Sequence, residues 1–353
     1  MSIHSAATMG LNLRNESNSV PHNSRETRYR VWWAVYLLHI SLCVMTGRFP
    51  SSTEDSCTTP LPVPFAEKDF SQSEVDQLIG DHEARALFMR NLVLPASAQM
   101  AEKAVLPESE ARQSSIHAQH VGQIASAAAQ VLAPNAPLHF LHYVELGLIT
   151  RRSVDALYAP GAGRKSWRSI EMVISALCSR ADAWLSKLPA EFHFTQGAPA
   201  CERERLHLAF SFYSTKIVVT QPCLSRILLQ ATFDDQAETF CATMAAMCVD
   251  MACQLIQLLP DTPDLTLIYE LAPWWCIVHF IMQAITTILI SLFIKEKTHT
   301  VQHPKAIDNV SKAADWLASL AEKDASAQRA WAAIQDLLSH REIEAAMKSR
   351  NSD

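Results

Sequence analysis

Apolar residues occur along this chain in long blocks, and prolines stand between the blocks. In the stretch Val31–Met45 only His39 and Ser41 are clearly polar. A helix that is apolar on every side belongs inside its domain. The pattern therefore predicts a central, enclosed helix over residues 26–46, closed by Gly47, because helices often end at a glycine that adopts positive φ.

The other blocks also show helical periodicity. Ser71 and Glu74 have the spacing of a capping box, and Pro222 is expected to stop a helix because proline lacks an N–H. Residues 50–64 are predicted to form an extended proline-rich loop, and residues 95–113 a variable linker. Further helices are expected over 3–13, 71–94, 114–132, 138–158, 166–188, 202–221 with a continuation to 229, 234–259, 274–293, 304–321 and 326–348.

Composition supports this interpretation. The chain has 353 residues, of which 49% are hydrophobic and 19% charged, and it contains only 8 glycines. A sheet protein needs many turns, and turns need glycine, so we expect an all-α fold. The domain organisation that we expect is one helical body over 1–353, divided into 1–25, 26–94, 95–113 and 114–349.

Charge and cysteine spacing bear on nucleic-acid binding. The formal net charge is −6, whereas a domain that holds DNA by itself is expected to have a basic surface. Nine cysteines are present and none forms a C-x-x-C pair, so the sequence predicts no zinc cluster within it. The glycosylation sequons at Asn15 and Asn309 are interpreted as chance matches.

No catalytic motif is present, and we expect neither a catalytic nor a metal site. His139, His142 and Glu145 are spaced by three and share a helix face, a geometry that can hold a metal, but ordinary polar contacts are the favoured interpretation. His117 and His120 repeat the spacing and are interpreted in the same way.

Residues 273–294 are long and apolar enough to cross a membrane, because they contain about 20 residues without a charge. Polar residues recur within the segment, however, so a core helix is favoured and no membrane partner is expected. These polar residues form a stripe that is a speculative effector site between helices: His279, Gln283, Thr286 and Thr287.

Two aromatic pairs, Trp32-Trp33 and Trp274-Trp275, invite a ligand-stacking interpretation. Core packing is the simpler expectation, because adjacent helical residues point about 100° apart and can contact different neighbours. Similarly, the proline-rich loop is either a partner-binding strand or a covered connection, and the covered connection is favoured.

Residues 28–62, which run from RYRVWWAV through GRFP to PLP, resemble the signature of the fungal-specific transcription factor domain, the middle homology region of zinc binuclear cluster regulators. Other segments are similar to later parts of that domain, in the same order. They are SAATMGLNL, HYVELGLITRRSVDALYAPG, ADAWLSKLPAEF, HLAFSFYSTKIVVTQPCL and PWWCIVHFIMQAITTILISL.

The chain departs from the family pattern in three ways. His39 stands where the family usually has Asp, and Gln221 stands where it has Arg. The sequence also opens within the family domain, which suggests either a shortened paralogue or a truncated gene model whose start codon lies inside a longer gene. The uncovered face of the Trp-Trp helix is then expected to promote self-association or binding of a protein partner.

The resemblance implies a nuclear transcription regulator that reaches DNA indirectly or through an upstream domain, with zinc only in that domain and a small-molecule effector. Two other classes remain open: a helical small-molecule-binding protein or enzyme, and a protein associated with membranes through residues 273–294.

Overall fold

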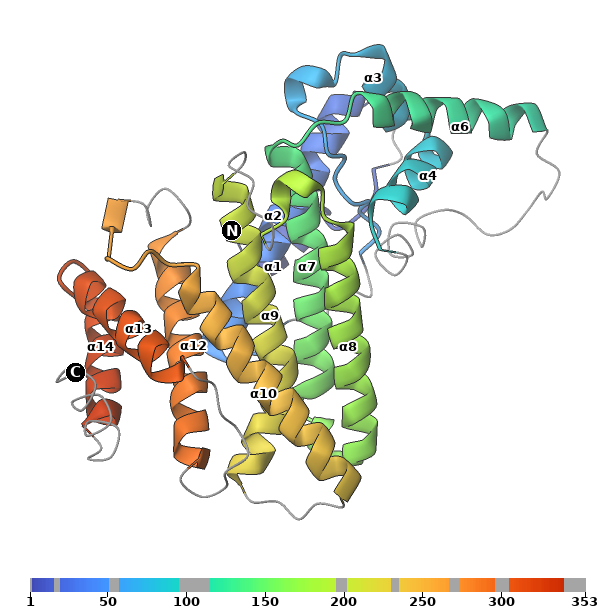
Figure 1. Ribbon diagram of the computed structural model, residues 1–353. Helices are drawn as coiled ribbons and strands as arrows, with labels where there is room; N and C mark the ends of the chain where they lie inside the picture. The colour runs from blue at the N-terminus through green and yellow to red at the C-terminus, as the bar shows by residue number, and fades with distance from the viewer. Residues whose placement is uncertain are drawn as a thin grey trace. The chain divides into compact units, whose positions relative to one another are not determined.

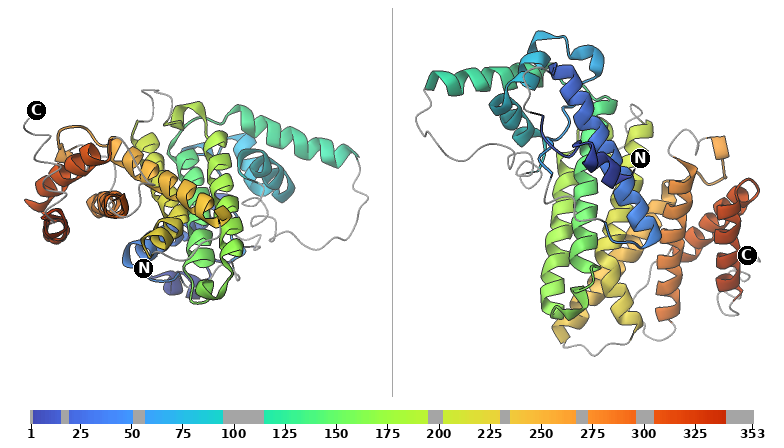
Figure 2. Two further views of the ribbon diagram at one scale, coloured as in Figure 1. Left: turned by 60° about the horizontal axis from the view of Figure 1, so that its bottom comes forward. Right: turned by 180° about the vertical axis from the view of Figure 1, so that it is seen from behind.

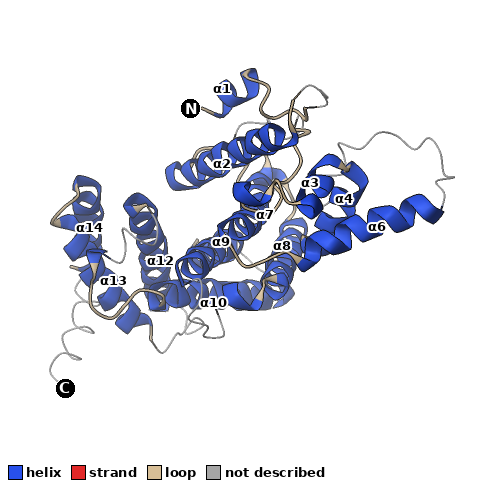
Figure 3. Cartoon of the chain, turned by 90° about the horizontal axis from the view of Figure 1, so that it is seen from above, coloured by secondary structure: helices blue, strands red, loops and turns tan. Residues whose placement is uncertain are grey.

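The computed structural model describes residues 2–15, 20–50, 57–94, 115–194, 202–229, 235–266, 273–295 and 305–339. Within these ranges all regular structure is helical and no strand is present (Figure 3). The all-α prediction is confirmed. The expected linker over residues 95–113 lies outside the described residues.

The chain forms two compact units, Met1–Gly163 with Ser179–Leu208, and Arg164–Cys178 with Ala209–Asp353. Two helices, α8 (Trp167–Lys187) and α9 (Glu202–Leu228), contribute to both units. The expected organisation as one regulatory domain stays a prediction. The other helices of the first unit are α1 (Ile3–Thr8), α2 (His22–Thr46), α3 (Ser73–Gly80), α4 (His82–Leu92), α6 (Ser115–Gln130) and α7 (Ala136–Leu157) (Figure 1).

The second unit contains α10 (Asp235–Gln257), α12 (Trp274–Lys295), α13 (Ala306–Ala321) and α14 (Ala325–Leu338). The last three lie side by side in both views of Figure 2. The core of this unit includes the apolar face of α12, on which Ile277, Ile281 and Ile285 are fully buried.

The signature helix α2 begins earlier than expected, at His22, because Pro21 occupies its N-cap position. Its end is as predicted: Gly47 has a φ of 63°, and the Arg48 N–H donates to the Cys43 carbonyl. This arrangement satisfies a carbonyl that a helix end otherwise leaves unpaired.

The prediction that α2 is enclosed on all sides is wrong. Trp32, Trp33, Tyr36 and Ile40 on one face are buried, but other apolar side chains remain exposed. A neighbour covers a helix on one side only, and the apolar pattern does not say how many neighbours the helix has. The exposed side chains are Val31 at 39%, Leu38 at 44% and Leu42 at 45%.

Helices α2 and α7 approach each other closely at Gly147. A Cβ atom at this position would lie 2.4 Å from Cδ2 of Leu37, nearer than real Cβ contacts allow. The absence of a side chain at Gly147 therefore permits the buried face of α2 to pack directly on α7.

The proline-rich segment after α2 is a covered connection where the structure describes it. Leu61, Val63 and Phe65 are each at most 2% exposed. The Trp33 Nε1–H donates to the Pro60 carbonyl at 2.8 Å. The alternative interpretation as an accessible partner-binding strand does not fit this burial for residues 59–65.

Charged side chains hold the backbone of this segment. Glu26, which is fully buried, accepts the Val63 N–H at 2.7 Å and pairs with Arg85 of α4 at 2.8 Å. Arg85 donates to the Leu61 carbonyl, and Arg30 donates to the Val63 and Phe65 carbonyls. We call these three side chains, Glu26, Arg30 and Arg85, the backbone clamp. Because an extended segment has no internal backbone partners, the clamp supplies the hydrogen bonds that its burial requires.

Other helix boundaries differ from the sequence predictions. Helix α1 stops at Thr8 because Gly10 adopts a φ of 66°. The capping box at Ser71 is wrong: α3 begins at Ser73 and has no side-chain cap. The helix expected over residues 71–94 is two helices, because Asp81 leaves helical geometry and caps α4 by accepting the N–H groups of the second and third residues after it.

Pro222 does not stop α9, contrary to expectation; the helix continues through it to Leu228. Proline removes one intrahelical hydrogen bond, but the side chains around it are buried, with Val219 and Cys223 at 0% exposure. Their packing holds the helix together across the missing bond.

Two described helices are long and apolar enough to span a membrane by length and composition, Glu238–Gln257 and Trp275–Phe293. Only the second of these was expected from the sequence. Of the residues in the most apolar part of each helix, 44% are buried in the first and 56% in the second. The core helix of a protein can meet the same criteria of length and composition.

Candidate functional site

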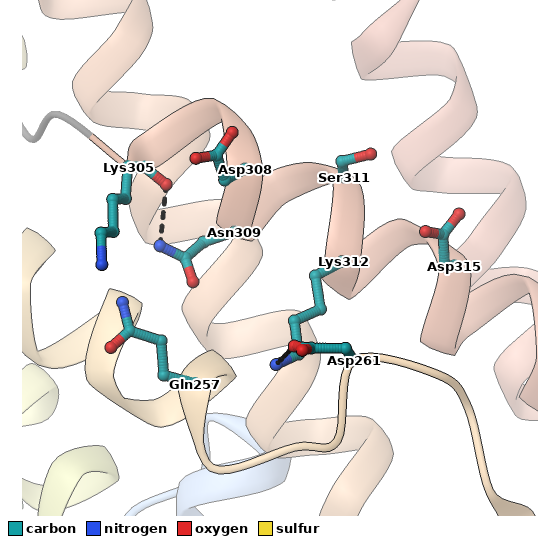
Figure 4. A pocket seen from close by; sticks show the side chains of 8 residues that line it. All are labelled: Gln257, Asp261, Lys305, Asp308, Asn309, Ser311, Lys312 and Asp315. Atoms are coloured by element: carbon teal, nitrogen blue, oxygen red, sulfur yellow. Dashed lines mark hydrogen bonds and ion pairs between the residues drawn. The ribbon is translucent and has the colours of Figure 1, made fainter. Parts of the chain in front are cut away.

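A hollow lies where the end of α10 meets the start of α13, in the second unit. Its volume is about 360 Å³. Lys305 and Lys312 supply positive charge, and three aspartates and three neutral polar residues complete the lining. These six are Asp261, Asp308, Asp315, Gln257, Asn309 and Ser311 (Figure 4).

One end of the hollow is formed by an ion pair. Lys312 Nζ lies 2.8 Å from Oδ1 of Asp261, and the Lys312 side chain is 17% exposed whereas that of Asp261 is 98% exposed. The hydrogen bond from Lys312 lowers the pKa of the Asp261 carboxyl, with a further contribution from its positive charge. Because Asp261 faces water, a ligand can displace it from Lys312 at small energetic cost.

The other end is formed by Lys305, Gln257 and Asn309, whose side chains gather together in Figure 4. Asn309 is 3% exposed, and its Nδ2 donates to the Lys305 carbonyl at 2.8 Å. The position of the loop after α10 is set by Trp316, whose Nε1–H donates to the Pro260 carbonyl at 2.9 Å. The lining offers donors, acceptors and both charge signs, which suits a small polar molecule.

This hollow was not predicted from the sequence. Lys305, Asn309 and Lys312 recur at spacings of four and three along α13, but the sequence does not reveal that Gln257 faces them. Asn309 belongs to the second glycosylation sequon. Its burial agrees with the interpretation of that sequon as a chance match.

The polar stripe of α12 bonds mostly within the protein. Ser214 Oγ donates to Gln283 Oε1 at 2.6 Å, and Gln283 Nε2 donates back to the Ser214 carbonyl at 3.3 Å. The hydroxyls of Thr286 and Thr287 donate to carbonyls of their own helix. His279 differs, because its Nε2 is buried without a partner and burial lowers its pKa to about 4. Whether this stripe meets an effector stays a prediction.

His139, His142 and Glu145 do not converge on one point. Glu145 accepts the Leu94 N–H at 2.8 Å, and its other oxygen lies 3.4 Å from His142 Nδ1. His139 Nε2 instead lies 3.1 Å from Nδ1 of His207 on α9. Among the described residues no three His, Cys, Asp or Glu side chains are placed to hold a metal ion.

Burial, rather than catalysis, accounts for the titration of this imidazole pair. Desolvation, with a smaller contribution from the nearby His142, lowers the pKa of His139 to about 4. Desolvation likewise lowers the pKa of His207 to about 3. In the second pair of the sequence, His117 Nε2 lies 2.9 Å from a carboxylate oxygen of Glu83, and the side chains of His117 and Glu83 are about half exposed.

Core packing is confirmed for the first tryptophan pair. Trp32 and Trp33 are both buried, and Tyr36 contacts the rings of both, at centroid distances of 6.4 and 5.3 Å. Trp275 is half-buried, and the side chain of Trp274 lies outside the described residues.

The comparisons with known proteins agree with the signature. Residues 1–115 match the family model of the fungal specific transcription factor domain. The chain is 29% identical to transcription regulator galc of Aspergillus niger over 94% of its own length and 42% of that protein. A second relative, an uncharacterised transcriptional regulatory protein of Schizosaccharomyces pombe, is 32% identical over 22% of this chain and 10% of its own length.

No solved structure matches the chain. The chain spans less than half the length of the curated relatives it matches. The family is one of transcription regulators and not a class of enzymes. Its matched region contains α2, the buried proline-rich segment and the backbone clamp. Residues 1–115 are therefore similar to the fungal specific transcription factor domain, and the chain over most of its length is similar to a transcription regulator.

Proposed function

We propose that this chain is the regulatory part of a nuclear transcription regulator, that it has no catalytic activity, and that it acts on transcription without binding DNA by itself. The observation that carries the proposal is the family match over residues 1–115, which includes the signature helix and its clamp. The net charge of −6 supports indirect rather than direct contact with DNA.

A tethering experiment tests this function. The whole chain is fused to an unrelated DNA-binding module, and transcription is measured from a reporter that carries the cognate site. We expect transcription to rise or fall relative to the module alone, whereas the unfused chain should not shift that DNA in an electrophoretic assay. Reporter output equal to that of the module alone would contradict a regulatory role.

Localisation is a separate part of the proposal. A fluorescent fusion of the chain should accumulate in nuclei, alone or with its partner. Fluorescence that follows internal membranes would instead favour the membrane-associated alternative, for which α10 and α12 have the necessary length.

The regulatory activity is proposed to respond to a small polar effector. Two places in the second unit are candidates: the α12 stripe and the hollow between α10 and α13. The hollow is favoured, because Gln283 and the two stripe threonines already have hydrogen-bond partners within the protein. The side chains at the hollow line an open space of about 360 Å³, and the exposed Asp261 can leave Lys312 when a ligand enters.

Thermal-shift measurements with sugars, amino acids and organic acids test the effector. A ligand at a hundred times its Kd stabilises the folded state by about 2.7 kcal/mol. Loss of the shift in Gln257→Ala/Lys305→Ala but not in Gln283→Leu would place the effector in the hollow, and the reverse would place it at the stripe. If no compound raises the melting temperature, the effector part of the proposal is wrong.

A further inference from the structure

A small cavity in the first unit lies beside the backbone clamp. Its volume is about 20 Å³, and three basic side chains line it: Arg14, which follows α1, and His82 and Arg85 of α4. We call this space the arginine cavity. We propose that it binds a small inorganic anion of the size of chloride, and that this anion stabilises the clamp around the proline-rich segment. The proposal does not rest on the function proposed above.

Arg85 has a donor to offer such an anion. A guanidinium carries five N–H groups. Nη1 of Arg85 donates to Glu26 and Nη2 donates to the Leu61 carbonyl, whereas Nε is buried and has no hydrogen-bond partner among the described residues. The Arg85 side chain is only 7% exposed. A buried donor without a partner costs folding free energy, so an acceptor in the cavity that reaches this N–H removes that cost.

The arginines of this region share a buried carboxylate. Glu26 lies 2.8 Å from Arg85 and 3.9 Å from Arg30, so one negative charge serves two cations. Arg14 brings a further positive charge to the cavity, and its backbone N–H donates to Oγ1 of Thr58 at 2.9 Å, which places Arg14 beside the proline-rich segment. Buried charge is unfavourable unless opposite charge balances it. An anion is therefore a better acceptor for this cavity than a neutral molecule.

The imidazole of His82 reports the electrostatic potential at the cavity. Burial, with smaller contributions from the positive charges of Arg14, Arg85 and Arg25, lowers the pKa of His82 to about 4, and Asp81 acts in the opposite direction. Three cations and one acid thus act on this imidazole, and it is neutral at pH 7. A neutral imidazole still carries one N–H that can donate to an anion.

The size of the arginine cavity selects the class of ligand. About 10–15 Å³ of such space holds one water molecule, so a cavity of about 20 Å³ admits a monatomic ion but not a phosphate or a larger metabolite. Apolar side chains complete the wall, among them Leu61, Met89 and Ala86, and the first two are at most 2% exposed. An apolar wall lowers the local dielectric and strengthens the attraction between an anion and Arg85.

Amide hydrogen exchange of the full chain tests the proposal in solution. Chloride is titrated at constant ionic strength against gluconate, which is too large for the cavity. The Val63 amide, which is bonded to Glu26 of the clamp, should exchange more slowly along a saturating curve. The rate should fall about elevenfold at ten times the Kd, because the anion leaves when the clamp opens. The Ile281 amide of α12 should not respond. A Val63 rate that ignores chloride, or a change shared equally by Ile281, would overturn the proposal.

Variants locate the effect. Arg14→Gln removes a charge from the cavity, and Ala86→Leu fills the cavity and leaves every charge in place, so both should weaken or abolish the chloride dependence. Arg90→Gln is the matched control, because Arg90 is an exposed residue of α4 that does not line the cavity. If Ala86→Leu does not fold, Arg14→Gln decides. A chloride dependence in Arg14→Gln equal to that of the wild-type chain would contradict the assigned site.

Bromide provides the direct observation, because it replaces chloride and scatters X-rays anomalously. In crystals of the full chain grown in bromide, an anomalous peak should lie against Arg85 in the arginine cavity. Bromide peaks at other places only would overturn the proposal. A peak in the cavity without the chloride dependence in solution would mean an adventitious ion only, and this too would overturn it.

Discussion

At the scale of single residues, the structure is most constrained where charge is buried. Glu26 and Arg85 lie far apart in the sequence, and neither stands in a motif that predicts their pairing. Sequence patterns report periodicity along one element and not which elements meet, so the clamp could not be predicted. The burial of Trp32 and Trp33 could be predicted, because large aromatic residues on an apolar helix face pack in the core.

Replacement of Glu26 tests the clamp. In Glu26→Gln the Arg85 charge loses its partner inside the protein, and the free energy of unfolding should fall by about 3–5 kcal/mol, the usual cost of breaking a buried pair. Chemical denaturation of the variant and the wild-type chain measures this change in the free energy of unfolding. Asp76→Asn is the matched control, because its pair with His22 is exposed and should change stability by less than about 1 kcal/mol. Equal effects in the two variants would contradict the buried pair.

Acid should destabilise the first unit through its histidine pair. The pKa of His139 is about 4 in the folded chain and near 6.5 in the unfolded chain. The unfolded chain therefore binds protons first, so the contribution of His139 to stability is complete above pH 6.5 and is lost as the pH falls toward 4. Denaturation midpoints at pH 7 and pH 4.5 measure this loss of stability. The loss between the two pH values should be smaller in His139→Gln than in the wild-type chain. Identical losses in the two proteins would contradict the buried, neutral imidazole.

At the scale of elements, periodicity and proline spacing located nearly every described helix but not their ends. Pro222 inside α9 and the break at Asp81 between α3 and α4 are instructive. At Pro222 buried packing outweighs a local propensity, and at Asp81 a local cap outweighs continuous periodicity. The outcome at Pro222 depends on which side chains become buried, and this is settled only when the elements meet.

The contact between α2 and α7 gives a prediction at this scale. Gly147→Ala would place a methyl group against Leu37, and overpacking of this kind costs about 1–3 kcal/mol. Gly122→Ala on α6 is the control, because nothing lies within 4 Å of its added Cβ and helix propensity should raise stability by about 0.5–1 kcal/mol. Thermal melts should therefore move in opposite directions. A neutral Gly147→Ala would mean that the helices are farther apart.

At the scale of the whole molecule, the fold class and the family resemblance were accessible from the sequence, whereas the hollow was not. The family signature is local and ordered along the chain. The hollow needs Gln257 beside Lys305. Such long-range proximity is the part of a structure that one sequence does not contain.

The exposed face of α2 predicts self-association or capture of a partner. A contiguous apolar surface on a soluble protein marks an interaction site. Leu38→Glu/Leu42→Glu should shift the chain toward monomer in light scattering after size exclusion. Met172→Glu, at an exposed residue of α8, should not. A wild-type chain that is already monomeric at high concentration would count against the prediction.

Helix α2 and the backbone clamp hold residues 60–65 inside the fold. Amide hydrogen exchange measures this most directly, because the Val63 N–H is bonded to Glu26 in an otherwise irregular segment. The Val63 amide should exchange as slowly as the buried centre of α2, and much faster in Glu26→Gln. Exchange of the wild-type Val63 amide at the rate of an open loop would contradict it.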